Sequence, residues 1–425
     1  MLHYHHILHS KHHHASRALR HRDAGSDHDS RCQRDRTETS RSSGLGLLHH
    51  RSRRRANSSP QRNHLQKVSQ SQTVAPTTST NRHRLLFRPQ VLRDVTNIDT
   101  STTILGKKYD IPIAIAPSAY QKLAGGNGEP DTARAAWALG TNITLSSNAT
   151  TSLEDVATAL PERDEHYPKP WFQLYFLNSR NLTTDLIKRA ENSGYEALVL
   201  TVDTVVLGNR IHERKKPLKL PKGMEMSNVK SRRAGGVSKA GLLLQAKTAA
   251  DFKQIVEEHR DTLTDMSLRW DEVIPWLRSQ TKMKIILKGI LTEEDAKRAV
   301  ESGVDAIIVS NHGGRQLDGV PSTLEALPEI ADAVRGKIPV IFDGGITRGS
   351  DVFKALALGA DLCLIGRTAL WGLAWDGQKG VEGVLNILER ELSRTMALMG
   401  VARLRDISRS MLGRAKKTGF GVAKL

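Results

Sequence analysis

Cysteine is nearly absent from this 425-residue chain, in which only Cys32 and Cys363 occur. Two cysteines cannot build a disulfide framework, and no CxxC or Cys/His spacing indicates a structural zinc site. Long hydrophobic runs are also missing, since none approaches the ~18 apolar residues that a membrane span needs. These absences exclude a disulfide-rich secreted domain, and they predict a chain with no membrane span and no metal site.

Acidic residues are outnumbered as well, because 63 Lys and Arg face 45 Asp and Glu and leave a net charge of +18. Such a balance is typical of nucleic-acid-binding proteins. The excess is uneven, however: residues 1–84 carry +11 of it, and the other 341 residues carry +7. The unusual charge therefore belongs mainly to one terminal segment, and we expect no nucleic-acid partner.

That segment, residues 1–80, is rich in Arg, His, Ser and Gln and has no sustained apolar period. It offers too little apolar surface to offset its chain entropy, so we predict a disordered basic tail. The clusters His12–His14 and Arg53–Arg55 could bind a metal or nucleic acid, but a solvated low-complexity tail is the favoured interpretation. A mitochondrial transit peptide should be poor in acids. The segment is not, since it contains Asp23, Asp27, Asp29, Asp35 and Glu38.

Beyond residue 85 the pattern changes to short apolar runs that alternate with amphipathic stretches. Near-continuous apolar runs of this length indicate parallel strands covered on both faces. Helix signals lie between them, such as the Ser322/Glu325 capping-box spacing and Gly359 as a C-terminal stop. The runs are Ile111–Ala116, Ile143–Ser147, Trp171–Phe176, Ala197–Val202, Lys284–Leu287, Ala306–Val309, Pro339–Phe342 and Leu362–Ile365.

Eight strand–helix units of this kind predict an α/β fold, a (β/α)8 TIM barrel over residues 81–420. A doubly wound open sheet is the alternative, although it usually needs fewer strands. The connection after the fourth strand, residues 205–270, is unusually long and contains Lys215, Lys216, Lys219 and Lys222. A loop of that length is typical of a lid or of a partly disordered segment.

Active sites of such barrels lie at the carboxyl ends of the strands. His312 follows the sixth run beside a double glycine and is the strongest candidate base. Asp203 could hold its far nitrogen, and Arg210 and Arg315 could bind a carboxylate. Lys288 follows the fifth run, and the fifth strand is expected to end at Lys288-Gly289. Glycines after the seventh and eighth runs could approach a phosphate, so the residues indicate oxidation of a carboxylate-bearing substrate beside a phosphorylated cofactor.

The segment Ser310-Asn311-His312-Gly313-Gly314-Arg315-Gln316-Leu317-Asp318 resembles the signature of the FMN-dependent 2-hydroxy-acid oxidases and dehydrogenases. This family includes glycolate oxidase, lactate oxidase and the flavocytochrome lactate dehydrogenases. The resemblance covers residues 85–411 and extends to Phe172–Tyr175, Leu200–Thr204 and Asp343-Gly344-Gly345. It implies an enzyme that oxidises an (S)-2-hydroxy acid to the 2-oxo acid and is reoxidised by oxygen or another acceptor.

The resemblance also implies roles for individual residues. His312 would take a proton, with Asp203 behind it, and Lys288 would stabilise the anionic reduced flavin at its N1–O2 edge. Tyr175, Arg210 and Arg315 would bind the substrate. The residues implied to bind FMN are Ser118, Ala119, Ser146, Gln173, Thr201, Lys288, Ser310, Asp343, Gly344, Gly345, Arg348, Gly366 and Arg367.

Three positions depart from the family pattern. A substrate-binding tyrosine expected near the N-terminus has no counterpart, since Tyr4 lies in a different context. Thr347 stands where the family has a phosphate-binding arginine, with Arg348 beside it. Asn148 replaces a tryptophan of glycolate oxidases and leaves substrate size open. The alternative is therefore a non-catalytic or impaired flavin-binding barrel whose basic tail binds a partner.

The last residues, 421–425, end in Ala423-Lys424-Leu425, which is close to a peroxisomal address. We therefore expect a peroxisomal location, with the cytoplasm as the alternative. The family resemblance further implies a homo-oligomer, most often a tetramer.

Overall fold

The computed structural model describes residues 85–425 apart from 163, 216–217, 219, 230–242, 244–245 and 416–421. The predicted tail of residues 1–80 lies outside the described residues, and so do Cys32, Lys216 and Lys219. Among the described helices, none is long and apolar enough to cross a membrane.

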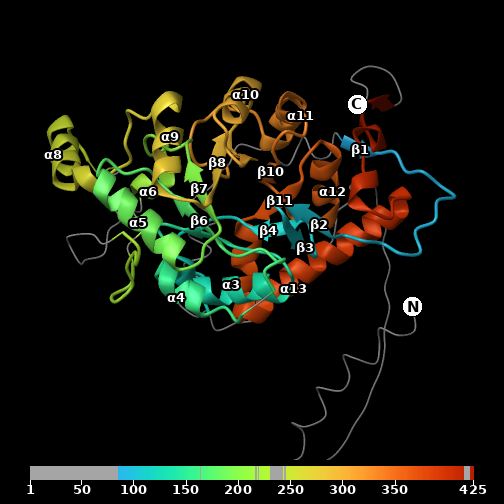
Figure 1. The fold of residues 1–425 in the computed structure, drawn as a ribbon, viewed down its shortest axis with the longest axis horizontal. Coiled ribbons are helices and arrows are strands. Elements are labelled where there is room, and N and C mark those ends of the chain that lie inside the picture. The colour runs from blue at the N-terminus through green and yellow to red at the C-terminus, as the bar shows by residue number, and fades with distance from the viewer. Residues whose placement is uncertain are drawn as a thin grey trace, which may run out of the picture. The chain divides into compact units, whose positions relative to one another are not determined.

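Within this part of the chain, eight parallel strands form one sheet in the order β4-β11-β10-β9-β8-β7-β6-β5. A parallel bridge between Ile115 and Ile143 joins the two outer strands, so the sheet closes into the predicted (β/α)8 barrel (Figure 1). The strands are β4 (Ile113–Ile115), β5 (Thr144–Ser146), β6 (Trp171–Leu174), β7 (Ala197–Thr201), β8 (Lys284–Ile290), β9 (Ala306–Val309), β10 (Val340–Asp343) and β11 (Leu362–Ile365).

The apolar runs form strands because both of their faces are buried. Ile307 and Val309 of β9 pack in the outer core against the helices, whereas Ile308 packs in a separate core inside the barrel. This alternation follows from the two-residue period of a strand. Each strand therefore presents its polar terminal residues from a rigid, fully packed base.

Helices follow the strands and cover the sheet (Figure 1). The predicted capping box begins α11, where the Ser322 backbone N–H and hydroxyl donate to Glu325 Oε2 at 3.1 and 2.8 Å. Gly359, with a φ of 108°, follows the end of α12 as predicted. The helices are α3 (Glu129–Ala138), α4 (Leu153–Thr158), α5 (Arg180–Asn192), α9 (Trp270–Gln280), α10 (Glu293–Glu301), α11 (Thr323–Val334), α12 (Gly349–Ala357) and α13 (Arg367–Met399).

The amino end of the barrel is closed by a hairpin that the sequence patterns did not indicate. Strands β2 (Thr102–Ile104) and β3 (Lys107–Tyr109) pair antiparallel. Their residues Ile104 and Tyr109 are buried in the inner core beside Trp171 at the start of β6. The hairpin therefore seals the end of the barrel opposite the predicted site.

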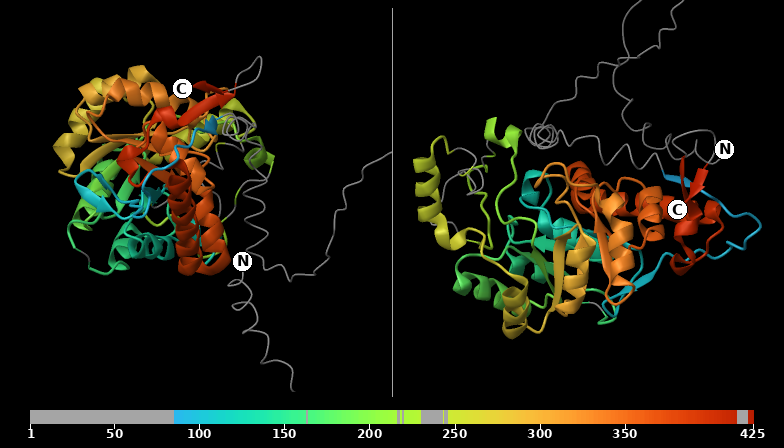
Figure 2. Two further views of the ribbon diagram at one scale, coloured as in Figure 1. Left: turned by 90° about the vertical axis from the view of Figure 1, so that its right-hand side faces the viewer. Right: turned by 90° about the horizontal axis from the view of Figure 1, so that it is seen from above.

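A second small sheet joins the two ends of the described chain. Strand β1 (Leu85–Phe87) pairs with β12 (Leu412–Ala415), which pairs with β13 (Val422–Lys424). Figure 2 shows β1 beside the C-terminal strands. Ala423 and Lys424 of the address-like tripeptide lie in β13, and the peroxisomal location stays a prediction.

The long connection after β7 is partly described. It contains α6 (Ile211–Lys215), one helical turn long, and α8 (Ala249–His259), which has no buried residue. Figure 1 shows α8 at the edge of the molecule, away from the barrel strands. The start of this connection, by contrast, is held against the candidate active site.

Candidate active site

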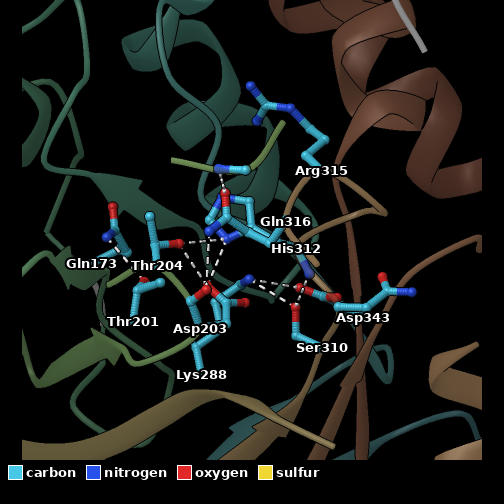
Figure 3. Close-up of polar contacts among 12 residues, drawn as sticks. Gln173, Thr201, Asp203, Thr204, Lys288, Ser310, His312, Arg315, Gln316 and Asp343 are labelled. Carbon is cyan, nitrogen blue, oxygen red and sulfur yellow. Dashed lines mark hydrogen bonds and ion pairs between the residues drawn. The ribbon is translucent and has the colours of Figure 1, made fainter. Parts of the chain in front are cut away.

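His312 and Asp203 form the centre of the candidate site, at the ends of β9 and β7. The Nδ1 atom of His312 lies 2.8 Å from Asp203 Oδ1, and the two side chains are 13% and 10% exposed. Thr204 Oγ1 also donates to Asp203 Oδ1 at 2.7 Å. Figure 3 shows the two side chains facing each other. The predicted pairing of the base with Asp203 is present.

The electrostatic surroundings determine which of the two side chains, His312 or Asp203, carries the hydrogen of their hydrogen bond. Burial opposes the charge of Asp203, but the hydrogen bond from His312 and the positive charge of Lys288 outweigh it, so the pKa of Asp203 is lowered. An ionised carboxylate only accepts, so Nδ1 of His312 carries the hydrogen and Nε2 keeps its lone pair. Burial lowers the pKa of His312, although Asp203 acts in the opposite direction. His312 is therefore a neutral base near pH 7, and no described residue makes a hydrogen bond to its Nε2.

The backbone that carries His312 is left-handed over three residues, with φ values of 58°, 67° and 73° for His312, Gly313 and Gly314. Such a conformation costs on the order of 1–3 kcal/mol for a non-glycine residue and clusters at functional sites. The Ser310 hydroxyl accepts a 3.1 Å hydrogen bond from the His312 N–H and supports the turn. The two following glycines let the chain reverse immediately and keep the imidazole at the strand end.

Lys288 lies below this pair in a buried polar network (Figure 3). Its Nζ donates to Ser310 Oγ at 2.8 Å and lies 3.2 Å from Asp343 Oδ2. Burial acts against its charge, but the charges of Asp343 and Asp203 outweigh burial and raise the pKa of Lys288. The lysine is therefore a fixed, desolvated positive charge.

A second network joins the ends of β5, β6 and β7. Gln173 Nε2 donates to Thr201 Oγ1 at 3.0 Å, and Gln173 Oε1 accepts from Ser146 Oγ and the Ser147 N–H, both at 3.2 Å. These side chains are buried, and every polar group named here has a partner. Tyr175, two residues beyond Gln173, is half-buried, and burial raises its pKa. The network gives this side of the barrel mouth a rigid polar wall.

Glycines follow β10 and β11, as predicted. Gly344 and Gly345 have φ values of 109° and 79°, and a Cβ on Gly344 would lie 2.6 Å from Thr323 Oγ1. Gly366 precedes α13, whose first helical residue is Arg367. A helix N-terminus presents unpaired N–H groups and a positive dipole end, which suit an anion.

The two arginines predicted to bind a carboxylate lie close together. Arg210 Nε donates to the backbone carbonyl of Arg315 at 3.4 Å. Both guanidinium groups contact Glu213 of α6, with Arg210 Nη1 at 3.3 Å from Oε2 and Arg315 Nη2 at 3.6 Å from Oε1. Burial and the neighbouring Arg315 charge lower the pKa of Arg210. The site therefore concentrates positive charge beside a neutral base.

Known proteins share this chain's sequence and fold. A family model described as FMN-dependent dehydrogenase matches residues 54–414. Glycolate oxidase of Spinacia oleracea is 47% identical over 328 residues, which cover 77% of this chain and 84% of that protein. For 2-hydroxyacid oxidase 1 of Mus musculus the identity is 43% over 337 residues, or 79% and 86% of the two chains. This chain belongs to the FMN-dependent dehydrogenase family.

Solved structures agree with this membership. A mandelate oxidase variant with (S)-mandelic acid superposes with a TM-score of 0.69 at 34% identity, covering 85% of this chain and 95% of that chain. The chain is thus an FMN-dependent oxidoreductase that acts on 2-hydroxy acids. The family match begins at residue 54, earlier than the resemblance that we described from residue 85.

The residues at the barrel mouth suit FMN, as the family requires. A flat polar ring needs buried donors along its edge, and Gln173, Thr201 and Lys288 are buried polar side chains at three adjacent strand ends. Asp343 Oδ1 is buried without a hydrogen-bond partner among the described residues, so it can accept from a ligand. Gly345, Gly366 and the start of α13 can receive the phosphate.

Of the other residues predicted to contact FMN, some lie near the site and one does not. Ser118 Oγ lies 4.0 Å from the Cβ position of Gly366, and Ala119 follows Ser118 in the same half-buried segment after β4. Arg367 Nη2 donates to the Gly313 carbonyl at 2.7 Å, which ties the phosphate side to the His312 turn. Arg348, in contrast, precedes α12 with an exposed side chain, and no described contact joins it to the other site residues.

Two residues of the site were missed by the sequence patterns. Glu213 lies in the basic connection after β7, and Gln316 lies in the signature segment without an assigned role. Gln316 Nε2 donates to the carbonyls of Asp203 and Val206 at 3.0 and 2.9 Å, and its Oε1 accepts from the Gly208 N–H at 3.1 Å. The position of Gln316, one residue after Arg315 in the signature segment, was the sequence feature that could have indicated its place in the site. Among the described residues, no cluster could hold a metal ion.

Replacing Gln316 by alanine is expected to loosen the segment from Asp203 to Gly208. Three backbone groups lose their partner, and a net hydrogen bond contributes about 1 kcal/mol. Because Arg210 lies only two residues beyond Gly208, we expect KM for the substrate to rise about fivefold and the free energy of unfolding to fall by about 1–2 kcal/mol. Steady-state kinetics and urea denaturation measure both, with Gln254→Ala on exposed α8 as the control. An unchanged KM would show that Gln316 does not position Arg210.

Proposed function

We propose that this protein oxidises a small (S)-2-hydroxy acid, of the glycolate or lactate type, to the 2-oxo acid and delivers the electrons to oxygen. The observation that carries the proposal is the neutral, Asp203-paired His312 beside Arg210 and Arg315. The names of similar proteins support the substrate class, since they include glycolate oxidase, 2-hydroxyacid oxidase 1 and an L-lactate oxidase of Nostoc sp. that is 44% identical over 329 residues.

Substrate binding follows from charge and shape. Arg210 and Arg315 present guanidinium forks that can hold one carboxylate, and planar forks match carboxylate geometry. Tyr175 lies two positions beyond Gln173, just past the end of β6, and its hydroxyl is a further polar group available to the substrate. Holding the carboxylate in this way brings the 2-hydroxy group toward Nε2 of His312.

When bound, FMN would supply the acceptor for the two electrons and one of the two hydrogens that the substrate loses. His312 takes one substrate proton on Nε2, and Asp203 stabilises the imidazolium that results, because it already accepts the Nδ1 hydrogen. Lys288 supplies a fixed positive charge at the strand end where FMN is expected to become more negative. Ser146, Gln173, Thr201 and Ser310 hold the donors and acceptors of this surface in place.

An anaerobic experiment tests the proposal. The purified protein carries FMN, and glycolate, L-lactate or longer 2-hydroxy acids are added without oxygen. Bleaching of the flavin by glycolate or by the (S) but not the (R) form of a chiral acid such as lactate, followed by recolouring in air with release of peroxide, is the expected result. An FMN spectrum unchanged by every 2-hydroxy acid would instead favour a non-catalytic flavin-binding barrel.

If the flavin recolours only with an added acceptor such as a quinone or a cytochrome, oxygen is not the acceptor. The proposed oxidation of the 2-hydroxy acid would still hold. The two halves of the proposal are therefore tested separately.

A further inference from the structure

Glu213 is a carboxylate of the chain itself that lies where the substrate carboxylate is proposed to bind. Its Oε2 is 3.3 Å from Arg210 Nη1, and its Oε1 is 3.6 Å from Arg315 Nη2. One side chain therefore contacts both guanidinium groups. Neither arginine makes another ion pair among the described residues.

These contacts leave part of the arginine hydrogen-bonding capacity unused. The 3.6 Å distance to Arg315 Nη2 exceeds that of a good charge-assisted hydrogen bond, which is about 2.7–2.9 Å. The Nε of Arg315 is buried and has no hydrogen-bond partner in the described chain. A carboxylate that approaches both nitrogens of this guanidinium would satisfy it better than Glu213 does.

Electrostatics explain why some carboxylate is needed there. Arg210 is largely buried and close to Arg315, and both burial and the second positive charge disfavour its own charge. Glu213 acts against this destabilisation. When a substrate carboxylate arrives, it can take over this role, and Glu213 becomes redundant.

The location of Glu213 permits exchange. Its side chain is 27% exposed, and it belongs to the short helix α6, whose Ile211 is 57% exposed. The chain just before α6 is pinned through Gly208 and Arg210 to Gln316 and Arg315. Among the described residues, a rotation of the Glu213 side chain toward solvent breaks only its contacts with the two arginines, and it leaves the Gly208–Gln316 and Arg210–Arg315 hydrogen bonds intact.

We propose that Glu213 is an internal substrate mimic: it occupies the carboxylate site of the free enzyme and is displaced when a 2-hydroxy acid binds. This rests on the proposed function of Arg210 and Arg315. With an internal competitor, the apparent affinity for the substrate equals the intrinsic affinity multiplied by the fraction of molecules whose carboxylate site is free. It also keeps two neighbouring arginines from capturing unrelated anions.

Replacing Glu213 by glutamine tests the proposal, because it keeps the shape and removes the charge. Pyruvate, a 2-oxo monocarboxylate, is titrated into the oxidised FMN-bound protein by calorimetry. We expect its Kd to fall about fivefold in E213Q, which corresponds to about 1 kcal/mol. Glu225→Gln, at an exposed position of the same connection, removes the same charge and is expected to change Kd less than twofold.

Pyruvamide, which has no negative charge, serves as the second probe and is expected to bind both proteins equally. An unchanged or higher Kd for pyruvate in E213Q would overturn the proposal, since Glu213 would then orient the arginines rather than compete. Failure of pyruvate to bind wild type and E213Q alike, with no bleaching by any 2-hydroxy acid, would overturn the proposed function itself.

Discussion

Replacement of His312 by glutamine is expected to slow substrate-dependent flavin bleaching by about 10³-fold, within the range of about 10²–10⁴ for a lost general base. Glutamine cannot accept a proton near neutral pH, whereas the neutral imidazole can at Nε2. FMN should stay bound, because Lys288, Gln173 and the glycines after β10 and β11 are unchanged. Anaerobic stopped-flow measurement of flavin bleaching gives the rate, and the absorbance of the purified variant gives FMN occupancy.

His166→Gln is the matched control for this variant. His166 is exposed and pairs with Asp164, and its backbone carbonyl accepts from the Lys108 N–H of the β2–β3 hairpin at the opposite end of the barrel, so its replacement should leave the bleaching rate unchanged. The His312 variant also needs a stability measurement, because residue 312 has a φ of 58°. Rapid bleaching in a folded, FMN-loaded His312→Gln protein would show that His312 is not the base.

The barrel could be predicted because its strands obey a local rule. Each run such as Ala306–Val309 is apolar on both faces, and this pattern depends only on neighbours in the chain. The polar residue after each run is then placed by topology, since all parallel strands end on the same side. His312, Asp203 and Lys288 came together for that reason, although 109 residues separate Asp203 from His312.

The missed features depend on contacts that no local pattern encodes. Glu213 lies in a basic connection with no apolar period, and its direction toward Arg210 and Arg315 depends on how the chain leaves β7. The hairpin of β2 and β3 was missed because its strands are short and only Ile104 and Tyr109 are buried. Lys288 was expected to end the fifth strand, but β8 continues past it to Ile290.

Replacement of Asp203 by asparagine is the second change with a large expected effect. The pH dependence of kcat/KM shows whether that effect is electrostatic. Asp203 raises the pKa of His312 against the stronger effect of burial. Without it the pKa falls further, so the acidic limb of kcat/KM should move to lower pH, below its position in the wild type. The plateau should drop about 10²-fold, because the imidazolium formed during turnover loses its counter-charge.

The sign of this shift separates electrostatic support from simple positioning. If Asp203 only oriented the ring, asparagine would lower the plateau and leave the limb in place, because the imidazole pKa would not change. Asp332→Asn, which removes an exposed ion pair with Arg409, controls for the loss of one acidic charge. A limb that moves to higher pH in Asp203→Asn would contradict an ionised Asp203 and would require the proton between the two side chains to be reassigned.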